Sequence, residues 1–181
     1  MQLPSATRLV ILSRGHAAEA RDWTREVMTR LGLTLNEAKT SIKQARRERF
    51  DFLGYTFGPH RFRKDGHWYL GAAPAKKAVK RIKGRVRQIL RPTNQEPWEE
   101  VVADLNSVLR GWARYFAYGT RLMAYRAVDH YVWERARHFL RRRHKVPSRG
   151  TRRFSADVVF GELGVFQLRR FHLASPAHAR V

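Results

Sequence analysis

Hydrophobic and polar positions in the first forty residues predict a small unit of strands around one helix. Residues 8–13 form a β-branched apolar run that is typical of a buried strand. Apolar residues then recur at helical spacing over residues 17–31, and Gly32 stands where a left-handed helix stop is favoured. Residues 33–35 predict a second strand and residues 36–40 a turn. The expected order is strand, helix, strand and turn.

The next segment predicts a strand and a hairpin rich in aromatic and basic side chains. Residues 50–57 alternate large apolar groups, which favours a third strand. Asp65 and Gly66 are a favoured pair for a two-residue turn, so residues 58–70 should form a hairpin. Its interleaved aromatic rings and cations suit stacking on bases together with phosphate contact. Aromatic packing across the two strands explains the same pattern equally well.

The second half predicts three amphipathic helices. Residues 76–91 place apolar side chains every three or four positions, and Pro92 ends this segment. Pro97 suits the first turn of a second helix, whose apolar stripe closes at Gly119. A third helix is expected over residues 122–143, with Leu122 among its buried positions. The predicted fold class is therefore α+β, with a strand-containing unit followed by a three-helix bundle.

Charge identifies the kind of partner. The chain of 181 residues has 37 Lys and Arg against 15 Asp and Glu, a net charge of +22 that favours a polyanion. Residues 76–91 and residues 137–153 each hold eight Lys or Arg and no acid. Like charges four residues apart disfavour a helix unless something neutralises them. Nucleic acid is favoured over an anionic membrane, because the apolar stripe of residues 76–91 is modest and neighbouring helices can receive it.

Several other classes are disfavoured by what the sequence lacks. There is no cysteine for a disulfide or a thiolate metal site, and the eight histidines are scattered without metal-ligand spacing. No apolar run approaches the roughly 20 residues of a membrane span, and the first 13 residues are too weakly charged for a secretory signal. We expect a cytoplasmic protein that binds no membrane, metal or cofactor.

Three sequence blocks, in this order, resemble the carboxy-terminal part of a group II intron reverse transcriptase and maturase. They are FDFLGYTF at residues 50–57, LNSVLRGWARYF at residues 105–116 and AVDHYVW at residues 127–133. The last two match the maturase-specific domain, and the basic segment of residues 76–91 precedes them as the family's thumb requires. The resemblance covers roughly residues 9–168.

The resemblance implies three parts. Residues 1–74 would be a truncated reverse transcriptase palm with a primer-grip-like hairpin, and residues 75–150 a helical thumb and maturase-specific domain, also called domain X. Residues 151–181 would be a trailing segment that ends in a frayed basic tail from residue 169 onward.

The resemblance also implies that this chain has no polymerase centre of its own. Residues 5–8, Ser-Ala-Thr-Arg, align with the family's Tyr-Ala-Asp-Asp, whose acids hold the catalytic metal ions. No catalytic residue is therefore expected. Lys39 corresponds to a basic residue near the primer end, and Phe52, Leu53 and Gly54 correspond to the primer grip. A solvated lysine and an aromatic core cluster are the ordinary alternatives.

The expected RNA contacts are the cations of the predicted helices. Arg110 and Arg114 lie away from the apolar stripe and either follow phosphates or are simply solvated. The complete predicted set consists of Lys76, Lys77, Lys80, Arg81, Lys83, Arg85, Arg87, Arg91, Arg110, Arg114, Arg141, Arg142, Arg143 and Lys145.

The favoured function is an RNA-binding maturase-type module that assists the folding and splicing of a structured group II intron RNA. Mg²⁺ would belong to the intron RNA or to the missing part of the palm. One alternative is the carboxy-terminal fragment of an RNA-directed DNA polymerase, which would bind a DNA/RNA duplex and act only with the missing half of the reverse transcriptase. Another is a non-functional remnant with an exposed, aggregation-prone palm edge.

Overall fold

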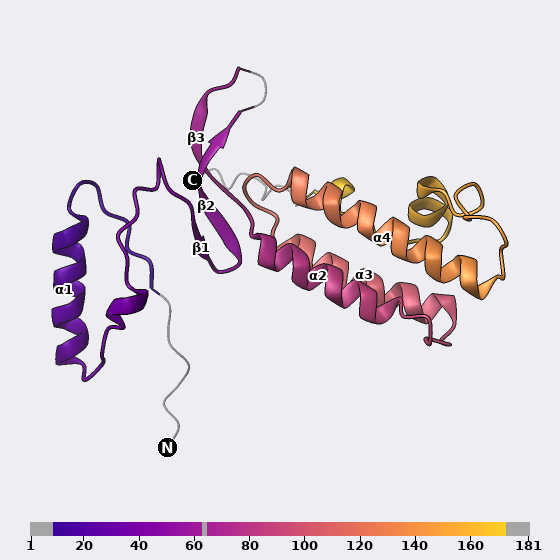
Figure 1. Ribbon diagram of the computed structural model, residues 1–181, viewed down its shortest axis with the longest axis horizontal. Coiled ribbons are helices and arrows are strands. Elements are labelled where there is room, and N and C mark those ends of the chain that lie inside the picture. Colours follow the sequence, from indigo (N-terminus) through magenta and orange to yellow (C-terminus); the bar gives the residue numbers. More distant parts are fainter. Residues whose placement is uncertain (1–8, 63–64, 173–181) are drawn as a thin grey trace, which may run out of the picture.

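The protein consists of an amino-terminal helix, a small sheet and a helical bundle. Its structure is a computed structural model that describes residues 9–62 and 65–172. A three-stranded antiparallel sheet with strand order β1-β2-β3 lies between α1 and a bundle formed by α2, α3 and α4 (Figure 1). The α+β fold class predicted from the sequence is confirmed.

The amino-terminal helix α1 (Ala17–Arg30) ends as its sequence predicts. Gly32 adopts φ 69° and its amide donates to the carbonyl of Thr29, while the amide of Leu33 donates to the carbonyl of Met28. This pair of bonds is a Schellman motif, which satisfies carbonyls that the last turn leaves unpaired. The expected apolar face is not buried, because Trp23 is 65% exposed and Thr24 is the buried residue of the helix.

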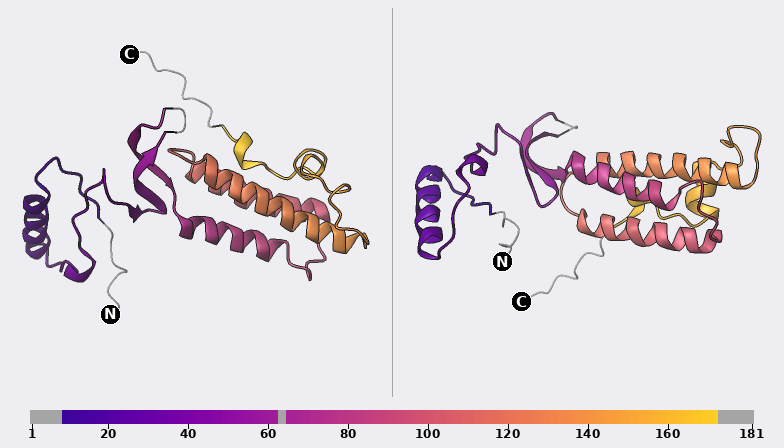
Figure 2. Two further views of the ribbon diagram at one scale, coloured as in Figure 1. Left: turned by 45° about the horizontal axis from the view of Figure 1, so that its top comes forward. Right: turned by 60° about the horizontal axis from the view of Figure 1, so that its bottom comes forward.

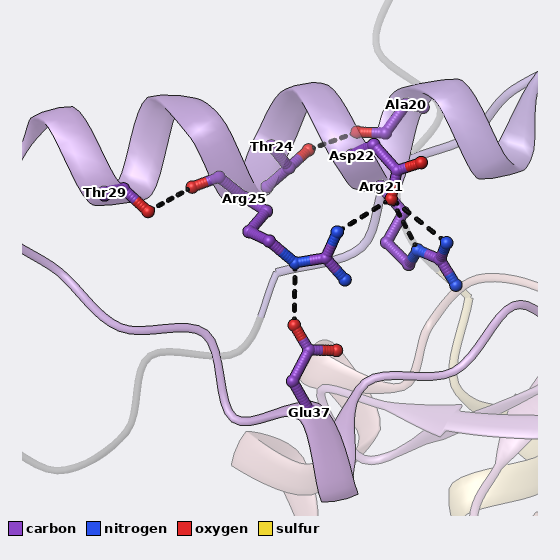
Figure 3. Close-up of polar contacts among 7 residues, drawn as sticks. All are labelled: Ala20, Arg21, Asp22, Thr24, Arg25, Thr29 and Glu37. Atoms are coloured by element: carbon purple, nitrogen blue, oxygen red, sulfur yellow. Dashed lines mark hydrogen bonds and ion pairs between the residues drawn. The ribbon is translucent and has the colours of Figure 1, made fainter.

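A polar contact of Arg25 links α1 to the short 3₁₀ helix η1 (Glu37–Lys39), which forms the predicted turn (Figure 3). The Arg25 side chain donates to Asp22 at 2.9 Å and to Glu37 at 2.8 Å. The hydrogen bond from Arg25 lowers the pKa of the Glu37 carboxyl. Exposed ion pairs of this kind contribute little to stability. The link between α1 and η1 is therefore weak.

Two predicted strands are wrong. The described part of residues 8–13 and residues 33–35 have no strand structure, and Leu9, Ile11 and Leu12 are 59%, 46% and 84% exposed. Arg8, the first residue of the predicted strand, lies outside the described residues. A strand depends on hydrogen bonds from a neighbouring strand as well as on apolar sequence. Neither segment pairs with one in the described part of the chain.

The sheet begins with a tight hairpin that the sequence pattern hides. Its strands are β1 (Phe50–Phe52), β2 (Tyr55–Arg61) and β3 (Trp68–Pro74). The single strand predicted over residues 50–57 is wrong, because Leu53 and Gly54 form a two-residue turn with φ values of 47° and 79°. Both residues have positive φ, as a type I′ turn requires. Leucine rarely adopts this conformation, so apolar alternation conceals the turn.

The hairpin formed by β2 and β3 is confirmed, but its turn is longer than predicted. Arg61 pairs with Trp68, and the Phe62 amide donates to the His67 carbonyl at 2.8 Å, so Asp65-Gly66 does not form a two-residue turn. The rings of Phe62 and His67 lie 5.1 Å apart, centre to centre. Cross-strand aromatic packing therefore accounts for part of the interleaved pattern. Trp68 remains 66% exposed.

The bundle confirms the three predicted helices. They are α2 (Lys76–Ile89), α3 (Trp98–Tyr115) and α4 (Leu122–Arg143). The chain runs out along α2, returns along α3 and runs out again along α4, so α2 and α4 are parallel neighbours (Figures 1 and 2). Val86, Leu105, Leu109 and Val132 are fully buried in the shared core. Leu122, which we expected to be buried, is 47% exposed at the first turn of α4.

Helix α3 ends earlier than the glycine stop predicts. The Tyr125 hydroxyl lies 2.8 Å from the carbonyl of Ala113 and 3.1 Å from that of Phe116. These contacts satisfy carbonyls of the last turn, so the helix ends at Tyr115. Burial raises the pKa of Tyr125 to about 12, which keeps the hydroxyl protonated as a donor. Gly119 lies in the following loop with φ 71°.

The trailing segment completes the core of the bundle. It contains η2 (Val158–Glu162) and η3 (Leu168–Arg170), and Val159, Val165 and Leu168 are almost fully buried against the helices. Asp129 of α4, 4% exposed, accepts hydrogen bonds from the amides of Leu168 at 2.8 Å and Arg169 at 3.1 Å.

The predicted fraying from residue 169 is therefore wrong for residues 169–171. The amide of Arg169 donates a hydrogen bond to Asp129, and the amides of Arg170 and Phe171 donate to the carbonyls of Gln167 and Leu168. The rest of the predicted tail, residues 173–181, lies outside the described residues. Burial raises the pKa of Asp129, although the hydrogen bonds from the two backbone amides oppose that shift. The two bonds thus keep this carboxylate in the core at a cost in solvation.

Replacing Asp129 with Ala should destabilise the bundle. The amides of Leu168 and Arg169 would lose their acceptor, which costs about 1–3 kcal/mol for a buried polar group. Urea denaturation measures the change. Asp104→Ala, at an exposed position of α3, is the control and should leave the midpoint nearly unchanged. Equal midpoints for the two variants would show that Asp129 does not hold the trailing segment.

Candidate nucleic-acid interface

The cations of α2 fall into two rows. Successive helical residues are rotated by about 100°, so side chains three or four positions apart align. We call Lys76, Lys80, Lys83 and Arg87 the proximal row, and Lys77, Arg81 and Arg85 the distal row. Ile82 and Val86 are buried on the opposite face. Lys83 is half-buried and its Nζ lies 5.2 Å from the ring centre of Tyr131 on α4. The proximal row therefore lies beside α4.

A polar face of α4 lies next to the proximal row. We call the line along which α2 and α4 meet the seam. Tyr131, Arg135, His138 and Arg142 are spaced by three or four residues and so share one side of the helix. Arg135 Nη2 donates to the carbonyl of Leu90 at the end of α2, at 3.2 Å. The contacts of Lys83 with Tyr131 and of Arg135 with Leu90 show that α2 and α4 run side by side. Basic side chains lie along the seam between them.

The seam ends in an open pocket with a volume of about 250 Å³. Its lining consists of Leu90, Pro92, Arg135, His138, Phe139, Arg141 and Arg142. The described lining thus holds three guanidinium groups and an imidazole, but neither Asp nor Glu. The Nε of Arg135 is buried and finds no hydrogen-bond partner among the described residues. Burial, together with the charges of Arg137 and Arg135, lowers the pKa of His138. The three guanidinium groups make the charge of the lining positive.

Comparison with known proteins identifies the helical part. Residues 79–155 match the family model of the group II intron, maturase-specific domain. This part of the chain is therefore similar to the maturase-specific domain of group II intron proteins. The predicted resemblance to the carboxy-terminal part of a group II intron maturase is thereby confirmed. The search of curated proteins found no match.

The maturase-specific domain contains two residues of the pocket that sequence reasoning missed. Arg135 and His138 precede the conspicuous Arg141-Arg142-Arg143 run and were not among the expected RNA contacts. Their spacing with Arg142 along one face of α4 was the available signal. Arg141 and Arg142, which were expected, line the same pocket.

Some of the predicted RNA-binding residues have partners within the chain. Arg143 donates to the carbonyl of Glu96 at 2.7 Å and to that of Gln95 at 3.1 Å, so it fixes the loop between α2 and α3. The Arg110 guanidinium lies 4.7 Å from the ring centre of Phe166 in the trailing segment. These two arginines stabilise the fold at other positions than the seam. Arg91, Arg114 and Lys145 are exposed.

The primer-grip-like turn docks on the end of α3. The Tyr115 hydroxyl donates to the carbonyl of Leu53 at 2.8 Å, and the Tyr55 hydroxyl donates to the carbonyl of Tyr115 at 2.7 Å. A Cβ at Gly54 would lie 3.2 Å from the Phe116 ring, so a larger residue would press on the bundle. Phe52 is half-buried and Leu53 is 61% exposed.

Lys39 belongs to a different part of the structure. It is exposed on η1, where its amide bonds to the side chain of Asn36, and η1 is linked to α1 through Arg25. Residues 5–8, which align with the family's catalytic motif, lie outside the described residues. None of the described helices is long and apolar enough to cross a membrane. In residues 9–62 and 65–172, no three His, Asp or Glu side chains gather as metal ligands.

Lys145 lies just beyond the end of α4, in a backbone conformation that favours glycine. Its φ is 49°, its amide donates to the carbonyl of Arg142, and the next amide, of Val146, donates to the carbonyl of Arg141. Lys145→Gly should therefore stabilise the domain by about 1 kcal/mol relative to Lys145→Ala. Thermal unfolding of the two variants measures the difference. Both variants lose the same charge, so equal melting temperatures would contradict a strained helix end.

Proposed function

We propose that this protein is an RNA-binding, maturase-type module that helps a group II intron RNA to fold and splice. The observation that best supports the proposal is that the proximal row of α2 lies beside the polar face of α4, in a region that matches the maturase-specific domain. The protein would act as an electrostatic brace that neutralises phosphates brought close together in the folded intron. Splicing chemistry and its Mg²⁺ would belong to the RNA. The proposal places this encounter in the cytoplasm.

The dimensions of the proximal row suit a nucleic-acid backbone. Lys76 and Arg87 are eleven residues apart, which corresponds to about 16 Å along a helix. A line of cations of this length can follow several successive phosphates. In the described part of the chain, no ion pair involves a cation of α2, so these charges remain available for a partner.

Removing three cations of the proximal row should weaken RNA binding more than removing the three cations of the distal row. Lys76, Lys80 and Arg87 are changed to Ala together, and Lys83 is kept because it contacts Tyr131. Binding to a group II intron RNA is then measured across a salt titration. The slope of log affinity against log salt should fall by about 0.7 for each single-strand phosphate that the variant no longer neutralises.

The matched control is the triple variant Lys77→Ala, Arg81→Ala and Arg85→Ala. It removes three cations from the same exposed helix. If net charge alone determines affinity, the two triple variants will bind the intron RNA equally weakly, and the proximal row will not be the RNA face.

Splicing tests the function itself. A precursor RNA that contains a group II intron is incubated at a Mg²⁺ concentration where splicing without protein is slow. The wild-type chain should accelerate splicing, and the proximal-row variant should accelerate it less than the distal-row variant. An unrelated RNA of equal length, compared in binding at high salt, separates intron recognition from general attraction to phosphate. No acceleration together with equal binding of both RNAs would contradict the maturase role.

The docked turn of Leu53 and Gly54 favours a second candidate function. In the resembling family a short hairpin ends the palm and is followed by the thumb, and here Tyr115 of α3 holds the turn of that hairpin. Under this alternative the chain would be the carboxy-terminal fragment of an RNA-directed DNA polymerase and would bind a DNA/RNA duplex. Residues 5–8 offer no carboxylate for metal ions. Primer extension would therefore require fingers and palm acids from elsewhere, and the chain alone should extend no primer.

A further inference from the structure

The pocket at the end of the seam differs from the open rows of cations. Arg135 and Arg142 give the pocket a cationic side next to the His138 imidazole. Leu90 and Phe139 form an almost fully buried apolar floor, and Pro92 is exposed at the rim. A solvated charged surface needs no hollow with an apolar floor. The combination suits a group with one anionic part and one flat, less polar part.

The size of the pocket limits what can occupy it. Its volume of about 250 Å³ lies below the roughly 300–1,000 Å³ of clefts that enclose drug-sized ligands. A projecting part of a larger molecule fits better than a free cofactor. The Arg135 guanidinium lines the pocket and donates one hydrogen bond, to the carbonyl of Leu90, so it has further donors that such a group could satisfy.

We propose that the pocket receives one unpaired nucleotide of the RNA bound along the seam. Its phosphate would contact Arg135 and Arg142, and its base would lie between Pro92 and a guanidinium plane, above the floor of Leu90 and Phe139. Unpaired nucleotides can be splayed from a stem and stacked on aromatic rings or guanidinium planes, whereas paired bases of an A-form stem cannot enter a pocket. This inference rests on the proposed RNA-binding function and adds a preference for irregular RNA.

Two RNAs test the proposal, a fully paired stem and the same stem with one bulged nucleotide. The wild-type chain should bind the bulged stem about tenfold more tightly, within the range measured for one stacked base. The pocket variant His138→Ala with Arg142→Ala removes two exposed side chains of α4 and should bind both stems equally. Circular dichroism and thermal unfolding check that each variant is folded.

The control variant is Arg126→Ala with His130→Ala. It removes one arginine and one histidine from exposed positions of the same helix, outside the pocket lining. This variant should keep the preference for the bulged stem. Retention of the preference by the folded pocket variant would overturn the proposal, as would equal binding of the two stems by the wild-type chain. If the chain fails to bind even the intron RNA, the proposed function itself is wrong, and that outcome is distinct from a missing bulge preference.

Discussion

The cationic face of α2 depends on burial of the opposite face of the same helix. Like charges at helical neighbours cost a few tenths of a kcal/mol per pair, whereas full burial of one large aliphatic side chain contributes about 1.5–3 kcal/mol. Ile82 and Val86 are 4% and 0% exposed, so packing against α3 and α4 exceeds the repulsion along α2. The helix can therefore present uncompensated cations without unfolding.

The same packing leaves one seam of the bundle open and closes another. Asp129 holds the trailing segment by accepting hydrogen bonds from two backbone amides. Val159, Val165 and Leu168 then enter the core shared with α3 and α4. The match to the maturase-specific domain ends at residue 155, but the core of the bundle extends beyond it. The side of the bundle covered in this way is separate from the seam between α2 and α4, where the proximal row lies.

The sequence predicted helices well, because helix signals are local. Pro92, the apolar spacing of α2 and the α4 periodicity act within a few residues, and the structure has helices at those places. The strand predicted at residues 8–13 is wrong over its described part, and so is the one at residues 33–35, because strand formation also depends on partners elsewhere in the chain. The turn at Leu53 was hidden, since leucine is rarely found with positive φ.

The candidate site was only partly predictable for a related reason. Composition shows where cations gather but cannot show whether a given guanidinium faces a phosphate, a carbonyl or a ring. Arg143 bonds to two loop carbonyls and Arg110 lies over Phe166, although both were expected to contact RNA. Arg135 makes such an internal bond, to Leu90, and yet also lines the pocket.

Arginine suits this double use, because its planar fork has five donors and one internal bond does not exhaust them. The α2 cations, in contrast, have no acidic partner in the described part of the chain. Exposed charges of that kind give an attraction that salt weakens and that distinguishes poorly between polyanions. Fixed donors around an apolar floor require a particular shape of ligand. Under the proposed function, selectivity for a folded RNA should therefore arise at the pocket, and affinity along the open seam.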